Sequence, residues 1–139
     1  MTNHGHKKIQ IIGGALAAAF LLWLVLFGLN GDRQSRLNDS LLGSATKGDA
    51  ATVATLIDRG ADIDARDSMG MTPLMWATLK GNKETMTVLI EARCDFTISN
   101  NDGLTALELA EQNHKTVRAQ FLRDAIERRA SKKKPTATQ

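Results

Sequence analysis

The same short pattern of residues returns every 33 positions, and this repetition limits the fold more than any other feature of the 139-residue chain. The stretch from Asp67 to Asp95 holds the clearest copy. One step forward, Gly70, Thr72, Leu74, Ala77 and Leu89 become Gly103, Thr105, Leu107, Ala110 and Leu122. One step back, Leu74, Gly81, Leu89, Ile90 and Asp95 become Leu41, Gly48, Leu56, Ile57 and Asp62. A repeat of this length indicates a structural unit that stacks on copies of itself.

The middle copy predicts a turn followed by two short antiparallel helices. Thr72 can cap a helix whose first residue is Pro73, where the missing N–H costs nothing. Gly81 is placed to end that helix, and Asn82 can cap the next. The second helix is amphipathic, since Met86, Leu89 and Ile90 follow the spacing i, i+3, i+4. One unit cannot bury its own apolar face, so neighbouring units must cover it.

The run G-x-T-P-L-M-W-A at 70–77 resembles the ankyrin repeat, and so does the turn R-G-A-D-I-D at 59–64. The chain departs from the family pattern at Met75, Arg93 and Ala106, where a histidine, a glycine and a proline are usual. The resemblance implies an all-α helix-turn-helix solenoid of about three repeats over residues 38–130.

The first and last units are expected to close the stack. Helices are expected over 41–47 and 50–58 in the first unit, capped by Asn38 or Asp39 and by Asp49. In the third unit, Thr105 and Glu108 form a capping box. Its second helix is expected to run from Lys115 or Thr116 to about Ala130, longer than its internal counterpart.

Residues 9–29 form an uncharged run of 21 residues, which at about 1.5 Å per residue spans a bilayer core. They predict one single-pass transmembrane helix, between a polar basic amino terminus (1–8) and a linker (30–37). Gly14 and Ala18 form a small-xxx-small pair, at which another membrane helix could associate.

The orientation of this anchor rests on weak charge signals. Lys7 and Lys8 on one side equal Arg33 and Arg36 on the other. A short basic leader is typical of a signal anchor. We therefore expect a cytoplasmic amino terminus, with the repeats on the opposite side of the membrane.

The charge is uneven along the chain. Residues 31–114 hold eight Lys/Arg and thirteen Asp/Glu, whereas residues 115–139 hold eight and two. Residues 131–139 are expected to be a basic disordered tail. Nucleic acid is not expected as a partner, because no aromatic residues interleave with the basic ones.

No catalytic constellation, phosphate-binding loop or metal-site spacing is present, so we expect no enzyme activity, no cofactor and no metal. Three aspartates, Asp62, Asp64 and Asp67, are interpreted as turn residues. The amino-terminal Thr2-Asn3-His4 leaves copper or nickel chelation open. Cys94, the one cysteine, is interpreted as a small apolar filler.

The predicted function is that of a membrane-anchored protein-interaction module. The resemblance implies contacts through repeat turns and first helices, and Met69, Met71, Leu79 and Leu104 are interpreted as an exposed apolar strip. The predicted partner-binding residues are Arg66, Ser68, Met69, Met71, Leu79, Lys80, Asn101, Asp102, Leu104 and Glu111. The alternative is a small accessory subunit of a larger membrane complex, docked by its transmembrane helix. Trp76 is interpreted as structural, with its ring in the space left by Gly43.

Overall fold

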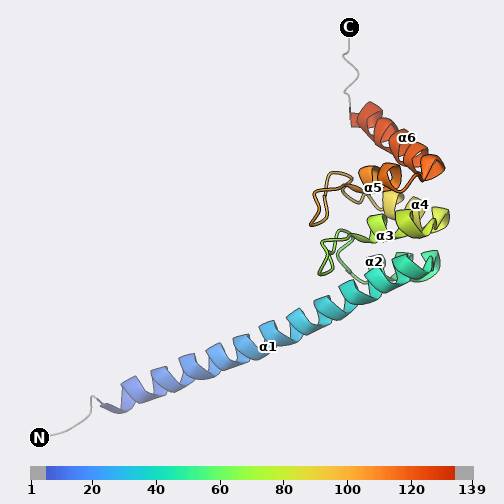
Figure 1. Ribbon diagram of the computed structural model, residues 1–139. Coiled ribbons are helices and arrows are strands. Elements are labelled where there is room, and N and C mark those ends of the chain that lie inside the picture. The colour runs from blue at the N-terminus through green and yellow to red at the C-terminus, as the bar shows by residue number, and fades with distance from the viewer. Residues whose placement is uncertain (1–5, 134–139) are drawn as a thin grey trace, which may run out of the picture. The chain divides into compact units, whose positions relative to one another are not determined.

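The computed structural model describes the backbone of residues 6–133 and the side chains of residues 17–26 and 31–133. Over this range the secondary structure is helical, apart from one isolated antiparallel bridge between Ser99 and Thr105. An all-helical repeat fold is therefore confirmed for the described residues (Figure 1). The helices are α1 (His6–Lys47), α2 (Ala50–Asp58), α3 (Pro73–Lys80), α4 (Lys83–Glu91), α5 (Ala106–Gln112) and α6 (Thr116–Lys133).

The chain divides into two compact units, Met1–Ser35 and Arg36–Gln139. In the first unit, α1 is helical from His6 onward, and every described side chain from 17 to 26 is exposed. The rings of Phe20 and Trp23 stack with their centroids 6.0 Å apart. Residues 30–37, predicted as a linker, are helical and belong to α1. This segment lacks apolar periodicity but contains no proline, and its single glycine, Gly31, lowers helix propensity by only about 1 kcal/mol.

The predicted transmembrane anchor is not confirmed by the structure. Across the side chains that the structure describes, no helix offers an apolar stretch long enough to span a membrane. Part of the predicted segment, residues 9–16 and 27–29, lies outside those side chains, and so does Gly14. Thr2, Asn3 and His4 also lie outside the described residues.

The predicted helix starts are largely confirmed, because each cap residue satisfies a backbone amide that the helix cannot. Thr72 accepts from the amide of Met75, with Pro73 in the first turn of α3. Asp49 accepts from the amide of Thr52 at 3.0 Å. Thr105 and Glu108 form the reciprocal capping box of α5. Gly81 ends α3 in the left-handed conformation, with φ of 86°.

Two predicted caps are wrong. Asn82 occupies the cap position of α4, but its side chain makes no capping bond and donates instead to the carbonyl of Ala45. Neither Asn38 nor Asp39 begins a helix, since both lie within α1. Asn38 instead accepts from the amide of Asp62 at 2.9 Å. In both cases a contact with a residue distant in the sequence replaces the local role that the sequence suggested.

The second unit is a stack of three helix pairs, formed by the end of α1 with α2, α3 with α4, and α5 with α6 (Figure 1). Helix α2 packs against α4, and α3 packs against α5, so equivalent helices of neighbouring repeats lie together. Leu56, Leu89 and Leu122, each one period apart, are all buried in one apolar core. This arrangement explains the 33-residue period, because the same side chain fills the same space in each layer.

Helix α6 closes the stack and is twice as long as α4, with 18 residues against nine. Its Arg118 donates to the carbonyls of Thr78 and Leu79 at the end of α3. Its Arg129 donates to the carbonyls of Ile90 and Cys94, around the end of α4. The guanidinium of Arg129 also lies 4.1 Å from the centre of the Phe96 ring. Two arginines thus neutralise carbonyls at the negative ends of two helices.

The boundary of the predicted disordered tail changes accordingly. Ser131, Lys132 and Lys133 are helical, so α6 ends three residues later than the sequence predicted. Residues 134–139 lie outside the described range. Arg129, which lies just before the predicted tail, is held in the fold by its two carbonyl acceptors and by an aromatic ring.

Trp76 packs against the core, but not in the space beside Gly43 that the sequence suggested. A Cβ atom added at Gly43 would meet nothing within 4 Å, so the Trp76 ring does not fill the space beside this glycine. The ring packs half-buried against the core, and its Nε1 donates to the carboxylate of Asp67 at 2.9 Å. The indole N–H finds its partner in its own repeat's turn.

Candidate interaction surface

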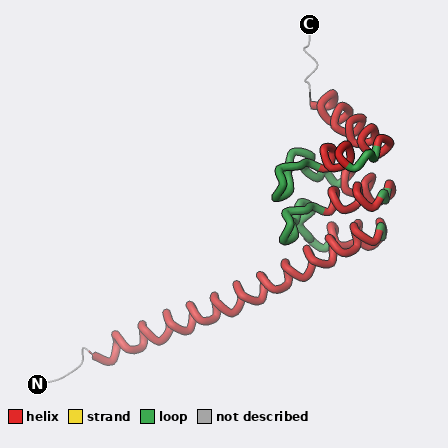
Figure 2. The backbone as a smooth tube through the Cα atoms, in the orientation of Figure 1, coloured by secondary structure: helices red, strands yellow, loops and turns green. Residues whose placement is uncertain are grey.

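Two long loops join the repeats, residues 59–72 between α2 and α3 and residues 92–105 between α4 and α5. Both project from the same side of the stack (Figure 2). They are bound directly to each other at their tips. The amide of Asn101 donates to the carbonyl of Met69 at 3.1 Å, and its side-chain amide donates to the carbonyl of Ser68 at 3.0 Å.

Asp67 organises the tip of the first loop. One carboxylate oxygen accepts from the amides of Met69 and Met71, both at 2.9 Å. The other oxygen accepts from Trp76 Nε1. An aspartate that bonds to the backbone two residues ahead is a common device for fixing a turn. The tip is thereby tied to α3 and is not a loose loop.

Arg66 ties the same tip to the second loop. Its Nε donates to the carbonyl of Gly70 at 3.2 Å, and its Nη2 donates to the carbonyl of Ser99 at 3.0 Å. The left-handed φ of 74° at Gly70 favours a residue without a Cβ. A Cβ there would also collide with Asn101 and Arg66. The tips of the two loops therefore form one preorganised surface.

At the base of the loops, aspartates accept from backbone amides of their own turn and of the neighbouring turn. Asp62 accepts from the amide of Asp64 at 3.0 Å, and Asp64 accepts from the amide of Asp95 at 2.9 Å. Burial raises the pKa of the Asp64 carboxyl, and the nearby charges of Asp95 and Asp62 add to the rise. Hydrogen bonds from Thr97 lower the pKa of Asp95. These contacts account for the aspartates as turn-forming and repeat-joining residues.

The predicted apolar strip is only partly exposed. Met69 is 52% exposed, whereas Met71 is 4% exposed and belongs to the core. Leu79 and Leu104 are half-buried and pack against that core. The interpretation of Met71 as a surface residue is wrong, because the turn held by Asp67 directs the chain back under the helices at this position. Replacing it with glutamate would place a charge in the core.

The remaining predicted contact residues are exposed, but several already have partners. Arg66, Ser68 and Asn101 make the inter-loop bonds described above. Asp102 accepts from the side-chain amide of Asn100 at 3.4 Å. Glu111 on α5 forms an ion pair with Arg123 on α6, and Lys80 is exposed at the end of α3. That these residues bind a partner stays a prediction.

Cys94 is buried, and its own backbone carbonyl accepts a hydrogen bond from Arg129. Burial raises the pKa of its thiol to about 12, and the charge of Asp64 contributes to the rise. A thiol with such a pKa is almost entirely protonated near neutral pH and is a poor nucleophile. The interpretation of Cys94 as an apolar filler agrees with this environment.

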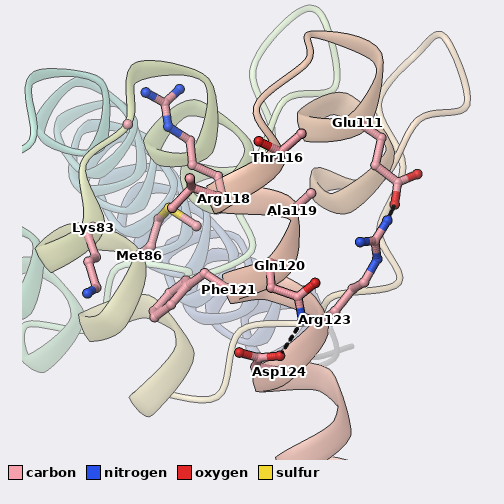
Figure 3. Close-up of a pocket in the computed structure, with 12 residues that line it drawn as sticks. Lys83, Met86, Glu111, Thr116, Arg118, Ala119, Gln120, Phe121, Arg123 and Asp124 are labelled. Carbon is pink, nitrogen blue, oxygen red and sulfur yellow. Dashed lines mark hydrogen bonds and ion pairs between the residues drawn. The ribbon is translucent and has the colours of Figure 1, made fainter.

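An open groove of about 960 Å³ runs along α6 and reaches α4, and the sequence did not reveal it (Figure 3). Met86 and Phe121 contribute apolar surface, and the Lys83 ammonium lies 5.9 Å from the centre of the Phe121 ring. The other charged groups have partners: Arg123 pairs with Glu111, Asp124 accepts from the Gln120 amide, and Arg118 donates to the carbonyls of Thr78 and Leu79.

Comparison with protein families agrees with this architecture. The model for ankyrin repeats in three copies matches residues 41–128, which is more than half of the chain. No curated protein matches the chain. Ankyrin repeats are typically protein-interaction modules and not enzymes. With three stacked helix pairs, a conserved period and a family match across all three, the chain belongs to the ankyrin repeat family.

Proposed function

We propose that this chain is a membrane-anchored interaction module that binds a protein partner through its loop tips and the ends of its first helices. One observation carries the proposal. The tip of the first loop satisfies its backbone groups within the two loops, yet it holds Met69 half-exposed. Met69 and the accessible edges of Leu79 and Leu104 place apolar surface on the preorganised loop tips, and binding energy is commonly concentrated in a few such anchoring side chains.

The proposed contact surface differs from the one that the sequence suggested. Met69 supplies the exposed apolar contact, and Leu79 and Leu104 supply only their accessible edges. Met71 supports the surface from below. The polar contacts proposed around this centre are Arg66, Ser68, Lys80, Asn101, Asp102 and Glu111.

A photo-activated crosslinker placed in the full-length chain tests the surface. Benzoylphenylalanine at position 69 or position 80 should give a discrete crosslinked band, while the same group at Glu84 on α4 should not. Glu84 is exposed on an outer helix, so it is a matched control. A band from position 84 but not from positions 69 and 80 would place the partner on the other side of the stack.

The membrane anchor is part of this proposal. Its support is the uncharged run at 9–29 and the exposure of large apolar side chains in its described part, such as Leu21 at 61%. Water does not favour so much exposed apolar surface, whereas lipid does. The chain should resist alkaline extraction from membranes. Arginine at both Leu21 and Val25 should release it, since each costs about 2.5–3.5 kcal/mol at a helix centre.

We also propose that the amino terminus is cytoplasmic and that the repeats lie across the membrane. A reporter that is active only outside the cytoplasm, fused after Gln139, should then be active. Two arginines inserted after Leu29 should weaken or invert this orientation. A stable but inactive fusion of the unmodified chain would place the repeats in the cytoplasm.

The exposed apolar side chains of residues 17–26 also favour a second candidate, an accessory subunit docked by α1. Here the small face that includes Gly14 and Ala18 would contact another membrane helix. Exchanging Ala18 for leucine separates the two candidates. Loss of a co-purifying membrane complex, with the crosslink at position 80 retained, would assign that complex to α1.

A further inference from the structure

The described methionines differ sharply in their access to solvent. Met69 is 52% exposed, whereas Met71, Met75 and Met86 are each at most 4% exposed. Two of the buried sulfurs also accept hydrogen bonds, Met75 from the amide of Thr72 at 3.4 Å and Met71 from Asn100 at 3.6 Å. A solvent-borne reagent therefore reaches one methionine sulfur on the repeat unit far more readily than the others.

The surroundings of Met69 keep its side chain in this exposed position. Its amide donates to Asp67, and its carbonyl accepts from Asn101. The side chain itself is not part of the core that the repeats share. A chemical change at the sulfur therefore leaves the contacts that fix the loop in place.

We propose that Met69 is an oxidation site at which a peroxide weakens partner binding, an inference that rests on the proposed function. The thioether sulfur attacks the peroxide oxygen, the O–O bond breaks and an S–O bond forms. The sulfur loses two electrons, and hydrogen peroxide is reduced to water. The product is methionine sulfoxide, which has a polar oxygen where the side chain was apolar.

The expected effect on binding follows from the position of Met69 at the centre of the proposed surface. An apolar contact loses water on binding, whereas a sulfoxide oxygen must give up its hydrogen bonds to water. The fold is unaffected, because the buried methionines stay reduced. Oxidation then acts on the surface and not on stability.

The first experiment follows the chemistry without a partner. Full-length protein is treated with dilute hydrogen peroxide, and oxidation of each methionine is followed by peptide mass spectrometry. Met69 should react at least about tenfold faster than Met71, Met75 and Met86, because reactivity follows exposure. In urea the four rates should converge. Equal rates in the folded protein would overturn the proposal.

The second experiment measures binding by the crosslink from position 80. Peroxide should reduce the band about tenfold in the unmodified chain, and Met69→Gln should reduce it without peroxide. Met69→Leu should retain the band and be insensitive to peroxide. Val117→Leu is the control for an apolar substitution outside the proposed surface, because Val117 is an exposed apolar residue on α6. It should leave both the band and its sensitivity to peroxide unchanged.

The outcomes separate this inference from the function on which it rests. A normal band after Met69 is fully oxidised would overturn the oxidation effect and leave the interaction module standing. If Met69→Leu abolished the band as completely as Met69→Gln, the shape of the side chain and not its polarity would govern the contact. That result would also overturn the proposed oxidation effect. No band from any variant would overturn both.

Discussion

Gly81 and His114 hold the same place in neighbouring repeats, and both lie in the turn after a first helix in the left-handed region, with φ of 86° and 55°. They differ in what covers them. A Cβ at Gly81 would collide with Arg118, which reaches over from α6. A Cβ at Gly48, one repeat earlier, would likewise collide with the side chain of Asn82. His114 is exposed, and no further repeat follows the closing helix in the described chain.

Two separate requirements therefore act on this position of the repeat, one on the backbone conformation and one on the size of the side chain. The turn itself requires positive φ in every copy, which any residue can adopt at some cost. The absence of a side chain is required only where the next repeat packs on the turn. A histidine is thus acceptable at the last turn because no further repeat of the described chain packs on it.

Met71 and Leu104 also lie one period apart, and they show the same difference between an internal and a closing repeat in the loops. Met71 is buried between repeats, whereas Leu104 is half-buried at the closing repeat. The closing repeat compensates for its single neighbour with a longer outer helix and two arginines that bind carbonyls of the middle repeat.

The largest expected effect is at Met71. Met71→Glu should destabilise the repeat unit by about 4 kcal/mol or more, because it buries an unpaired charge. Leu104→Glu should cost clearly less, since its side chain can reach water. Urea unfolding followed by circular dichroism measures both. Equal losses would mean that the internal and closing loops are equally covered.

Leu89 lies at the centre of the middle repeat and is fully buried. Leu89→Ala should cost about 2–5 kcal/mol through the lost apolar contacts and the cavity left behind. Val117→Ala, at an 82% exposed site on the closing helix, should stay within about 0.5 kcal/mol. A melting temperature unchanged by Leu89→Ala would remove this residue from the shared core.

Arg129 tests how the closing helix is held. Arg129→Ala should cost about 1.5–3 kcal/mol, because it removes charged hydrogen bonds to two carbonyls and a contact with Phe96. Arg128→Ala changes an exposed neighbour on the same helix and should be nearly silent. If both variants melt alike, α6 is held by apolar packing alone.

The smallest effect concerns the last turn. His114→Gly should stabilise by up to about 1 kcal/mol, because relief of the left-handed strain exceeds the added freedom of the unfolded chain. Gly81→Ala should have the opposite sign, since it adds both strain and overlap with Arg118. A destabilising His114→Gly would reveal a contact of the imidazole that the turn depends on.

Much of the fold could be predicted because the same pattern of apolar, capping and turn residues occurs in successive repeats. The caps at Asp49, Thr72 and Thr105 and the glycine end at Gly81 depend on nearby residues alone, so local chemistry was enough to predict them. Asn82 failed as a cap because its side chain bonds to Ala45, 37 residues away. The roles of Arg118 and Arg129 could not be predicted from the sequence. A basic residue on a helix is interpreted as solvent-exposed unless its hydrogen-bond acceptor is known.

The sequence by itself determined the repeat, its period, the positions of most helices and the family, because periodic apolar residues and turn residues act over short distances. Only the tertiary structure decided which apolar loop residues are surface. Met69 and Met71 are two positions apart and chemically identical. The carboxylate of Asp67 and the neighbouring loop fix the turn so that one side chain faces water and the other faces the core.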